Sequence, residues 1–409
     1  MPFGRLLNKS VSPIVADFGA SSVKLLQLTG GETPAIVSAQ MLEIPDEARG
    51  NTERRFAFLE GELSAVLKQG GFHGRRIIIS PASSHFMVQQ TRVDPDGPLS
   101  PDDQVRAEVA GRIGCAPRSV VARSFAVPGS DRERVALAIA RDEVMRHVDL
   151  VKRCRFDVVG VQPDHVPLLR AFDHLHRRDE DRHVVTMYVD TGWGAVKVAV
   201  ARGTEMVFAR IIHIGGRQFD EIAARSWGCT NADARNRRIE EERHAVDRPR
   251  ETPGAPVDEV AEMSPIMRAG LAKAERDARR SMPCGTPAVG VDRRVGEGHP
   301  SLSPVTTTGL ESDLAEVDDS IADELLMCGR YAQAAVGGPI DRMVMVGGES
   351  HSRRYASHLA RRMGVKSSVG DPISRLLAAT PEGAGVLDPA GEHPEWTIAC
   401  GLCACDAEA

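Results

Sequence analysis

The chain has 409 residues, of which 42% are hydrophobic and 26% are charged, values ordinary for a globular protein with two domains or one large bilobal domain. Its net charge of −6 provides no overall positive field, which argues against nucleic acid or an anionic membrane as a general partner. No apolar run approaches the length of a bilayer span, and eight irregularly placed cysteines favour a reducing cytoplasm over a disulfide framework.

An acidic segment that contains glycine occurs twice in the chain. Residues 17–24 read Asp-Phe-Gly-Ala-Ser-Ser-Val-Lys, and residues 190–197 read Asp-Thr-Gly-Trp-Gly-Ala-Val-Lys. Each copy lies in a stretch that predicts a strand, a tight turn and a second strand. Lysine is rare in this chain, so a lysine at the same offset in both copies indicates a fold-level duplication.

The repeated segment has the composition of a phosphate-binding turn. A glycine two residues after an aspartate lets backbone N–H groups approach phosphate oxygens closely. Asp17 and Asp190, facing each other across a cleft, would suit Mg²⁺, and Lys24 would reach phosphate as a point charge. The alternative is an ordinary hairpin in each copy, whose Asp and Gly only serve the turn. Two copies in register favour the phosphate site.

After the first turn, apolar residues at helical spacing predict a helix over 56–67 that ends at Gly70-Gly71. The next stretch predicts a compact α/β block inserted at 76–160. Its expected elements are a strand at 77–79, an alternating stretch around Phe86 and Val88, a helix at 105–113, strands near 120 and at 135–139, a helix at 144–151 and a strand at 158–161.

The second half opens with a predicted strand at 184–189, the second acidic turn and a hairpin that reaches residue 212. Gly215-Gly216 then begins a helix, where the glycines either cradle an anion or are plain loop residues. From 235 to 312 the chain is rich in Arg, Glu, Pro and Gly, with one expected helix at 257–280 and a loose stretch at 283–309. Because acids are interspersed, we interpret this region as solvated helix faces and a mobile loop rather than a nucleic-acid patch.

A third glycine turn follows an expected helix at 312–335 and an expected strand at 341–346. At Gly347-Gly348, before a predicted helix over 350–363, a backbone can lie flat against a planar group such as adenine, although such turns are common in α/β proteins.

Three cysteines, Cys400, Cys403 and Cys405, cluster near the end of the chain. Two or three thiolates would approach a metal at this spacing, but no second Cys or His pair accompanies them. Packing of a C-terminal helix is therefore favoured.

The three turns, in this order, resemble those of the actin-like ATPase superfamily and, within it, the PilM family of type IV pilus assembly. The resemblance implies a bilobal α/β fold of duplicated ribonuclease-H-like domains. The first lobe would span 11–182, with the inserted subdomain at 76–160, and a C-terminal helix at 393–409 would complete it. The second lobe would span 183–392, with a helical subdomain at 229–335 that carries a flexible charged loop.

The resemblance also implies an ATP and Mg²⁺ site, with Asp17 and Asp190 on the metal. The nucleotide would contact both acidic turns and both glycine pairs: Asp17, Gly19, Ser21, Ser22, Lys24, Asp190, Gly192, Gly194, Gly215, Gly216, Gly347 and Gly348. Gln162, or as second choice Asp164, would position water for hydrolysis, or Gln162 is a helix-entry residue without chemistry.

Four residues depart from the family pattern: Glu349, Arg235 and Arg238 on the adenosine side, and Trp193, which is bulky for the second phosphate turn. We therefore expect at most a slow ATPase.

By resemblance, the chain would be a cytoplasmic scaffold recruited to the inner face of the membrane. It would bind the cytoplasmic N-terminal segment of a single-span, PilN-like inner-membrane protein and other pilus or secretion platform proteins. Phe86, Val88, Val105 and Val109 would line the groove, or they are core. The alternatives are a small-molecule kinase, for which no sugar-binding cluster is found between 76 and 161, and a polymerising FtsA-like ATPase.

Overall fold

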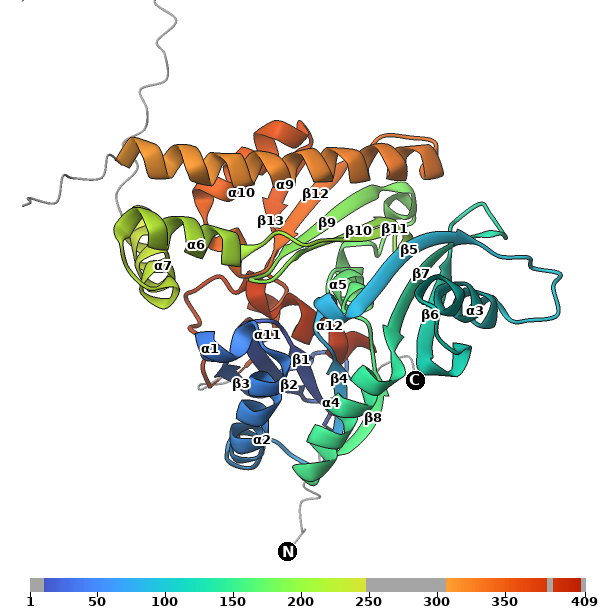
Figure 1. Cartoon of the computed structure of the whole chain (residues 1–409), viewed down its shortest axis with the longest axis horizontal. Coiled ribbons are helices and arrows are strands. Elements are labelled where there is room, and N and C mark those ends of the chain that lie inside the picture. Colours follow the sequence, from blue (N-terminus) through green and yellow to red (C-terminus); the bar gives the residue numbers. More distant parts are fainter. Residues whose placement is uncertain (1–10, 248–306, 381–384, 406–409) are drawn as a thin grey trace, which may run out of the picture. The chain divides into compact units, whose positions relative to one another are not determined.

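The computed structural model describes residues 11–247, 307–380 and 385–405, with side chains left undescribed at 242–247 and 307–308 (Figure 1). The chain divides into a main unit, made of residues 1–238 and 307–409, and a second unit of residues 239–306. The predicted helix at 257–280 and nearly all of the predicted loop at 283–309 lie outside the described residues.

The first sheet has five strands in the order β3-β2-β1-β4-β8. Its strands are β1 (Ile14–Phe18), β2 (Ser22–Leu28), β3 (Ile36–Glu43), β4 (Arg76–Ser80) and β8 (Asp157–Val161). β1 to β3 form an antiparallel meander, whereas β4 and β8 run parallel to β1. The first acidic turn therefore joins the central strand β1 to β2.

The second sheet repeats this order as β11-β10-β9-β12-β13. Its strands are β9 (Val185–Thr191), β10 (Val196–Arg202), β11 (Glu205–Ile212), β12 (Arg342–Val346) and β13 (Lys366–Val369). The directions match as well, since β9 to β11 are antiparallel and β12 and β13 run parallel to β9. This repetition confirms the predicted duplication and the bilobal α/β fold. We call each sheet with its helices a lobe; the boundaries at 11–182 and 183–392 stay a prediction.

A separate three-stranded sheet, in the order β5-β7-β6, lies between β4 and β8 in the chain. It consists of β5 (Phe86–Arg92), β6 (Val120–Ala126) and β7 (Glu133–Ala140), and α3 (Pro101–Ile113) packs on one face. The predicted insertion at 76–160 was too wide, because it includes β4 and most of β8, which pair in the first sheet.

Helices cover both faces of the two large sheets. They are α1 (Asp46–Arg49), α2 (Thr52–Gln69), α4 (Arg141–Arg153), α5 (His165–Arg170), α6 (Gly216–Trp227), α7 (Asn231–Asp247), α9 (Thr307–Val336), α10 (Arg353–Met363), α11 (Ser374–Ala378) and α12 (Thr397–Cys405). Single 3₁₀ turns occur at Ser83–His85, Pro117–Ser119, Asp173–Leu175, Asp179–His183, Gly348–His351 and Pro394–Trp396. In Figure 1 the layers follow one another as α9 with α10, the second sheet, α5 with α12, the first sheet, and α2 with α4.

The outer helices formed where apolar spacing predicted them. In α2, Asn51 caps the N-terminus by accepting from the Arg54 N–H, and every third or fourth side chain, such as Leu59 and Leu63, is buried against the first sheet. The predicted helix at 312–335 is confirmed as the larger part of α9, which packs on the second sheet.

The layer between the two sheets consists of α5 and α12. Leu168 and Leu402 share one core with Val15 of the first sheet and Tyr188 of the second. Cys400 and Cys403 are buried in the same core, so these two cysteines have a packing role, as expected.

The third sheet rests on both lobes. Val105 and Val109, with exposed fractions of 0% and 2%, belong to its own core under α3, so the prediction that they line a groove was wrong. On the other face, the half-buried Phe86 and Val88 pack against the cores of the main unit. Gln90 Nε2 on β5 donates to the carbonyl of Val207 on β11 at 3.3 Å.

Within the described residues, every helix is too short or too polar to cross a bilayer.

Candidate functional site

A buried arginine stabilises the first acidic turn through hydrogen bonds to its backbone. Arg55 on α2 donates to the carbonyls of Gly19 and Ala20 at 2.7 and 2.8 Å. Burial lowers the pKa of Arg55 to about 10. Lys24 Nζ lies 3.2 Å from Ser22 Oγ and 3.9 Å from Asp17 Oδ2. The predicted residues Asp17, Ser22 and Lys24 are therefore brought together.

The second acidic turn carries its own lysine. Lys197 Nζ on β10 lies 2.6 Å from Asp190 Oδ2 and 3.3 Å from Asp164 Oδ2. Burial acts to lower the pKa of Lys197, but Asp190 and Asp164 outweigh it and raise the pKa. His165 Nδ1 lies 3.1 Å from Asp164 Oδ1. This lysine stays charged and neutralises two buried carboxylates.

Three carboxylates act on one another around Lys197. Burial raises the pKa of Asp17, Lys24 and Lys197 act to lower it, and the negative charges of Asp190 and Asp164 add to the rise. Asp17 and Asp190, the first residues of the two copies of the repeat, thus lie close enough to interact across the two lobes. Asp164 joins them from the start of α5.

Gln162 forms its hydrogen bonds with residues outside the charged cluster. Its side-chain oxygen accepts from Arg123 Nη1 of β6 at 3.3 Å, and its backbone N–H continues the pairing with β4 through Ile79. Of the two predicted catalytic residues, Asp164 is the one that contacts the charged cluster.

The predicted glycines bring four backbone segments into close approach. A Cβ on Gly194 would lie 3.1 Å from the Cβ of Ala20, so the two acidic turns face each other directly. Gly347, after β12, has a φ of 88°, and a Cβ there would overlap the Asp190 carboxylate. Gly215 packs against the backbone of the second turn in the same way.

The start of α6 has partners for its backbone donors within the chain. The N–H groups of Gly216 and Arg217 donate to the carbonyls of Gly192 and Trp193 at 3.0 and 2.8 Å. The Gly215 N–H donates to Gln218 Oε1 at 2.9 Å. Of the two interpretations of Gly215-Gly216, this geometry favours tight packing over an anion cradle.

Next to the third glycine turn, an ion pair lies over the start of α6. A Cβ on Gly216 would overlap the carboxylate of Glu349. Arg238 Nη1 on α7 donates to Glu349 Oε2 at 3.1 Å, and its Nη2 donates to Asp220 Oδ1 on α6 at 2.6 Å. Arg235 donates from Nε to Asp220 Oδ2 at 3.0 Å.

Further contacts connect these ion pairs with α1 of the first lobe. Arg235 Nη1 donates to Asp46 Oδ1 on α1 at 3.0 Å. Trp193, in the second acidic turn, donates from Nε1 to Asp220 Oδ2 at 2.9 Å. The guanidinium groups of Arg49 and Arg235 both lie over its ring, at 5.4 and 5.7 Å from the ring centroid. We call this set the arginine network; its members are Asp46, Arg49, Trp193, Asp220, Arg235, Arg238 and Glu349.

Four residues that form these contacts were not predicted from the sequence: Lys197, Arg55, Asp46 and Asp220. Lys197 stood in the repeat at the offset of Lys24, and that offset alone was a sufficient signal for it. Arg55, Asp46 and Asp220 gave no signal, because their partners come from distant parts of the chain.

The residues present do not fit Mg²⁺ and ATP in this arrangement. The Lys197 ammonium lies between the Asp164 and Asp190 carboxylates, where it supplies the positive charge that a cation would bring. Glu349, which follows the glycine turn predicted for adenosine, lies against Gly216 at the start of α6, and Arg238 pairs with it. Among the residues that the structure describes, no group of three or more His, Cys, Asp or Glu side chains is arranged to hold a metal.

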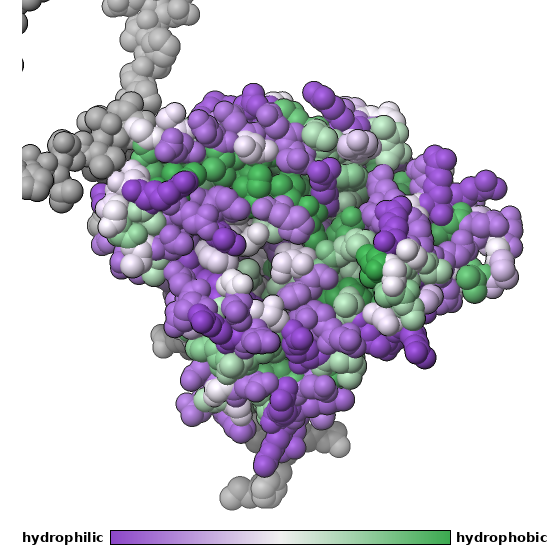
Figure 2. Space-filling view, in the orientation of Figure 1, coloured by the Kyte–Doolittle hydropathy of each residue, from purple (hydrophilic) through white to green (hydrophobic). Residues whose placement is uncertain are grey.

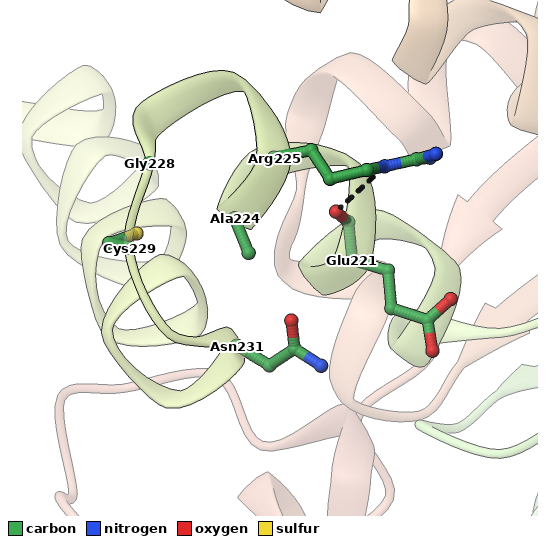
Figure 3. Close-up of a pocket in the computed structure, with 6 residues that line it drawn as sticks. All are labelled: Glu221, Ala224, Arg225, Gly228, Cys229 and Asn231. Atoms are coloured by element: carbon green, nitrogen blue, oxygen red, sulfur yellow. Dashed lines mark hydrogen bonds between the residues drawn. The ribbon is translucent and has the colours of Figure 1, made fainter.

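A shallow pocket at the corner between α6 and α7 is separate from these contacts (Figure 3). It is lined by Glu221, Ala224, Arg225, Gly228, Cys229 and Asn231. Arg225 Nε donates to the Glu221 carbonyl at 3.3 Å beside it. None of the predicted site residues lines this pocket.

Comparisons with known proteins agree with the fold. No protein-family model and no curated protein sequence matches the chain. Among solved structures, it is similar to a chain of the PilM-PilN type IV pilus biogenesis complex, with a TM-score of 0.66, 18% identity, and coverage of 98% of this chain and 99% of that chain.

Two other structures match more weakly. The ethanolamine utilization protein EutJ from Carboxydothermus hydrogenoformans has a TM-score of 0.47 and 10% identity, over 97% of this chain and 90% of that one. MreB5 of Spiroplasma citri bound to ADP has a TM-score of 0.41 and 10% identity, over 90% and 94%. These two scores are too low to support an argument. The first likeness, with the duplicated sheets, shows that the chain has a PilM-like, actin-like fold.

Proposed function

We propose that the chain is an assembly scaffold on the cytoplasmic side of a type IV pilus or a related secretion machine. It binds the cytoplasmic N-terminal segment of a single-span, PilN-like inner-membrane protein, which recruits it to the inner face of that membrane beside other platform proteins. The observation that carries the proposal is the agreement in fold over almost the whole of both chains with a component of a PilM-PilN complex.

The charged cluster supports a scaffold rather than an enzyme. A general base needs a carboxylate that can take a proton from its substrate, but Asp164 is buried and paired with both Lys197 and His165. Its pKa is lowered, since the contacts with Lys197 and His165 outweigh the effect of burial. Asp164 is therefore unsuited to be the general base that the kinase alternative needs. ATP and Mg²⁺, implied by the resemblance, are not needed for the scaffold role.

We assign partner binding to the three-stranded subdomain. Leu99, Ile113 and Val121 expose 51%, 52% and 37% of their surface there, although each is apolar. Ile113 is the last residue of α3, and Val121 lies on the face of the sheet away from α3, so the two probe different sides of the subdomain. Figure 2 shows further apolar surface beside β5, where the subdomain meets β11, within a largely hydrophilic face. An apolar surface next to an edge strand is a common receptor for an extended or helical peptide.

A binding experiment tests this proposal. The probe is a labelled peptide from the cytoplasmic N-terminal segment of the single-span, PilN-like membrane protein encoded next to this chain. The chain is titrated into the peptide, and fluorescence anisotropy measures binding. Ile113→Lys and Val121→Lys are expected to raise the Kd roughly tenfold or more, because each places a charge in an apolar contact.

Met327→Lys is the matched control, since Met327 is also apolar and 41% exposed but lies on α9. Its Kd is expected to equal that of the parent chain. A peptide that fails to bind the parent chain, or that binds all four proteins equally, contradicts the assignment.

A further inference from the structure

The arginine network joins two lobes at the place where the sequence predicted a nucleotide. α1, which carries Asp46, follows β3 of the first sheet, whereas α7, which carries Arg235, follows β11 and α6 of the second lobe. The contact from Arg235 to Asp46 therefore crosses from one lobe to the other. The stacking of Arg49 on Trp193 crosses between the same lobes.

The charges of the arginine network balance. Three arginines (Arg49, Arg235 and Arg238) face three carboxylates (Asp46, Asp220 and Glu349). The side chains of Arg235, Arg238 and Glu349 are only 14%, 15% and 16% exposed, and Asp220 is fully buried. Charges that already lie beside opposite charges do not need a ligand to neutralise them, although Asp46 Oδ2, Arg49 Nη1 and Arg235 Nη2 are buried without a hydrogen bond.

A nucleotide that contacts Gly216 would have to break these pairs. A planar base placed against Gly216 would meet the carboxylate of Glu349, and moving Glu349 leaves part of the Arg238 guanidinium without its partner. Phosphates between the acidic turns would have to separate Ala20 from Gly194. They would also approach a cluster whose lysines already contact Asp17, Asp164 and Asp190.

We propose that the arginine network takes the place of a nucleotide, so that the chain's own side chains hold the two lobes closed. The lobes then stay closed whether or not ATP is present. This inference concerns the state of the lobes, and it stands or falls independently of the partner that the three-stranded subdomain binds.

The first test is a titration of the full chain with Mg²⁺-ATP and with Mg²⁺-ADP, followed by calorimetry and by thermal unfolding. We expect no binding heat and no change in Tm at millimolar nucleotide, because a ligand that binds only the folded state would raise the Tm. A stoichiometric binding heat, or a Tm that rises with nucleotide concentration, overturns the proposal.

The second test opens the contact between the lobes. Asp46→Asn weakens the pairing with Arg235 and Arg49 but leaves Arg235 bound to Asp220, so the second lobe keeps its charge balance. Hydrogen exchange of α1 and of the turn between β9 and β10 is expected to become roughly tenfold faster.

The control for Asp46→Asn is Glu133→Gln. Glu133 also pairs with an arginine, Arg92, at 3.0 Å, but in an exposed position where β5 ends and β7 begins in the three-stranded sheet. Exchange at α1 should be unchanged in this variant. If exchange at α1 is the same in Asp46→Asn as in the parent chain, the arginine network does not hold the lobes together and the proposal is wrong.

Discussion

Lys197 and Lys24 occupy equivalent places in the repeat but have different surroundings. Lys197 Nζ contacts two buried carboxylates at 2.6 and 3.3 Å, whereas Lys24 Nζ lies 3.9 Å from one carboxylate and donates to a hydroxyl. The second lysine therefore neutralises more buried charge. The duplication of the fold has been kept while the roles of the duplicated side chains have diverged.

The Lys197→Met variant tests this difference. Without the ammonium, Asp164 and Asp190 are left buried without their main cation, and we expect a loss of about 3 to 5 kcal/mol in the free energy of unfolding at neutral pH. Urea denaturation measures it. Lys24→Met is the control and should lose clearly less. We also expect Mg²⁺ to stabilise Lys197→Met but not the parent chain; equal losses in the two variants contradict this account.

Gly347 and Gly348 are neighbours with opposite requirements. Gly347 has a φ of 88°, and a Cβ there would overlap the Asp190 carboxylate, whereas a Cβ on Gly348 meets nothing within 4 Å. We expect Gly347→Ala to lose roughly 2 kcal/mol or more, and Gly348→Ala to change stability by no more than about 1 kcal/mol. Thermal unfolding of the two variants decides this, and similar Tm values for both would show that the close approach at Gly347 is unimportant.

At the scale of elements, two 3₁₀ turns meet through a cluster of two histidines and a glutamate. His351, in the turn at Gly348–His351, lies with Nε2 2.8 Å from Glu395 Oε2, and His393 Nδ1 lies 3.3 Å from Glu395 Oε1. The hydrogen bond with Glu395 raises the pKa of His393 to about 9. Burial acts to raise the pKa of Glu395, but hydrogen bonds from His351 and His393 outweigh it and lower the pKa to about 2.

This cluster predicts a loss of stability at alkaline pH. A folded-state pKa above the ordinary 6.5 means that the folded chain holds the His393 proton more tightly than the unfolded chain. The contribution is therefore complete below about pH 6.5 and is lost as the pH rises through about 9. We expect the Tm to fall over this range and the fall to be smaller in Glu395→Gln. An identical pH dependence in the two proteins contradicts the role of this contact.

Elements formed by local sequence were predictable, and those formed by distant pairing were less so. The hairpins β1-β2 and β9-β10 join residues that are close in the chain, so alternation and turn residues revealed them. The predicted insertion was too wide because sequence does not show that β4 pairs with β1 and β8 with β4. The groove prediction was wrong for Val105 and Val109. A helix has the same apolar spacing in its sequence whether that face packs on its own sheet or binds another protein.

At the scale of the whole molecule, the repeated acidic segment was enough to predict the duplicated fold. It did not predict which side chains pair with one another in the site. The sequence placed Asp17 and Asp190 in matching turns, and the structure brings them together. It also identified Arg235, Arg238 and Glu349 as departures. Their consequence depends on Asp46 and Asp220, which contact them from a different lobe and a different helix. Such contacts follow from the fold and not from the spacing of residues.

The most direct test of the scaffold account is the affinity of the full chain for the partner's cytoplasmic peptide, measured by calorimetry with and without Mg²⁺-ATP. If the lobes are held closed by the arginine network and the three-stranded subdomain binds the partner, the nucleotide-free chain binds the peptide and Mg²⁺-ATP leaves the Kd unchanged. A peptide that binds only when Mg²⁺-ATP is present would contradict the account, because it would show that nucleotide controls assembly.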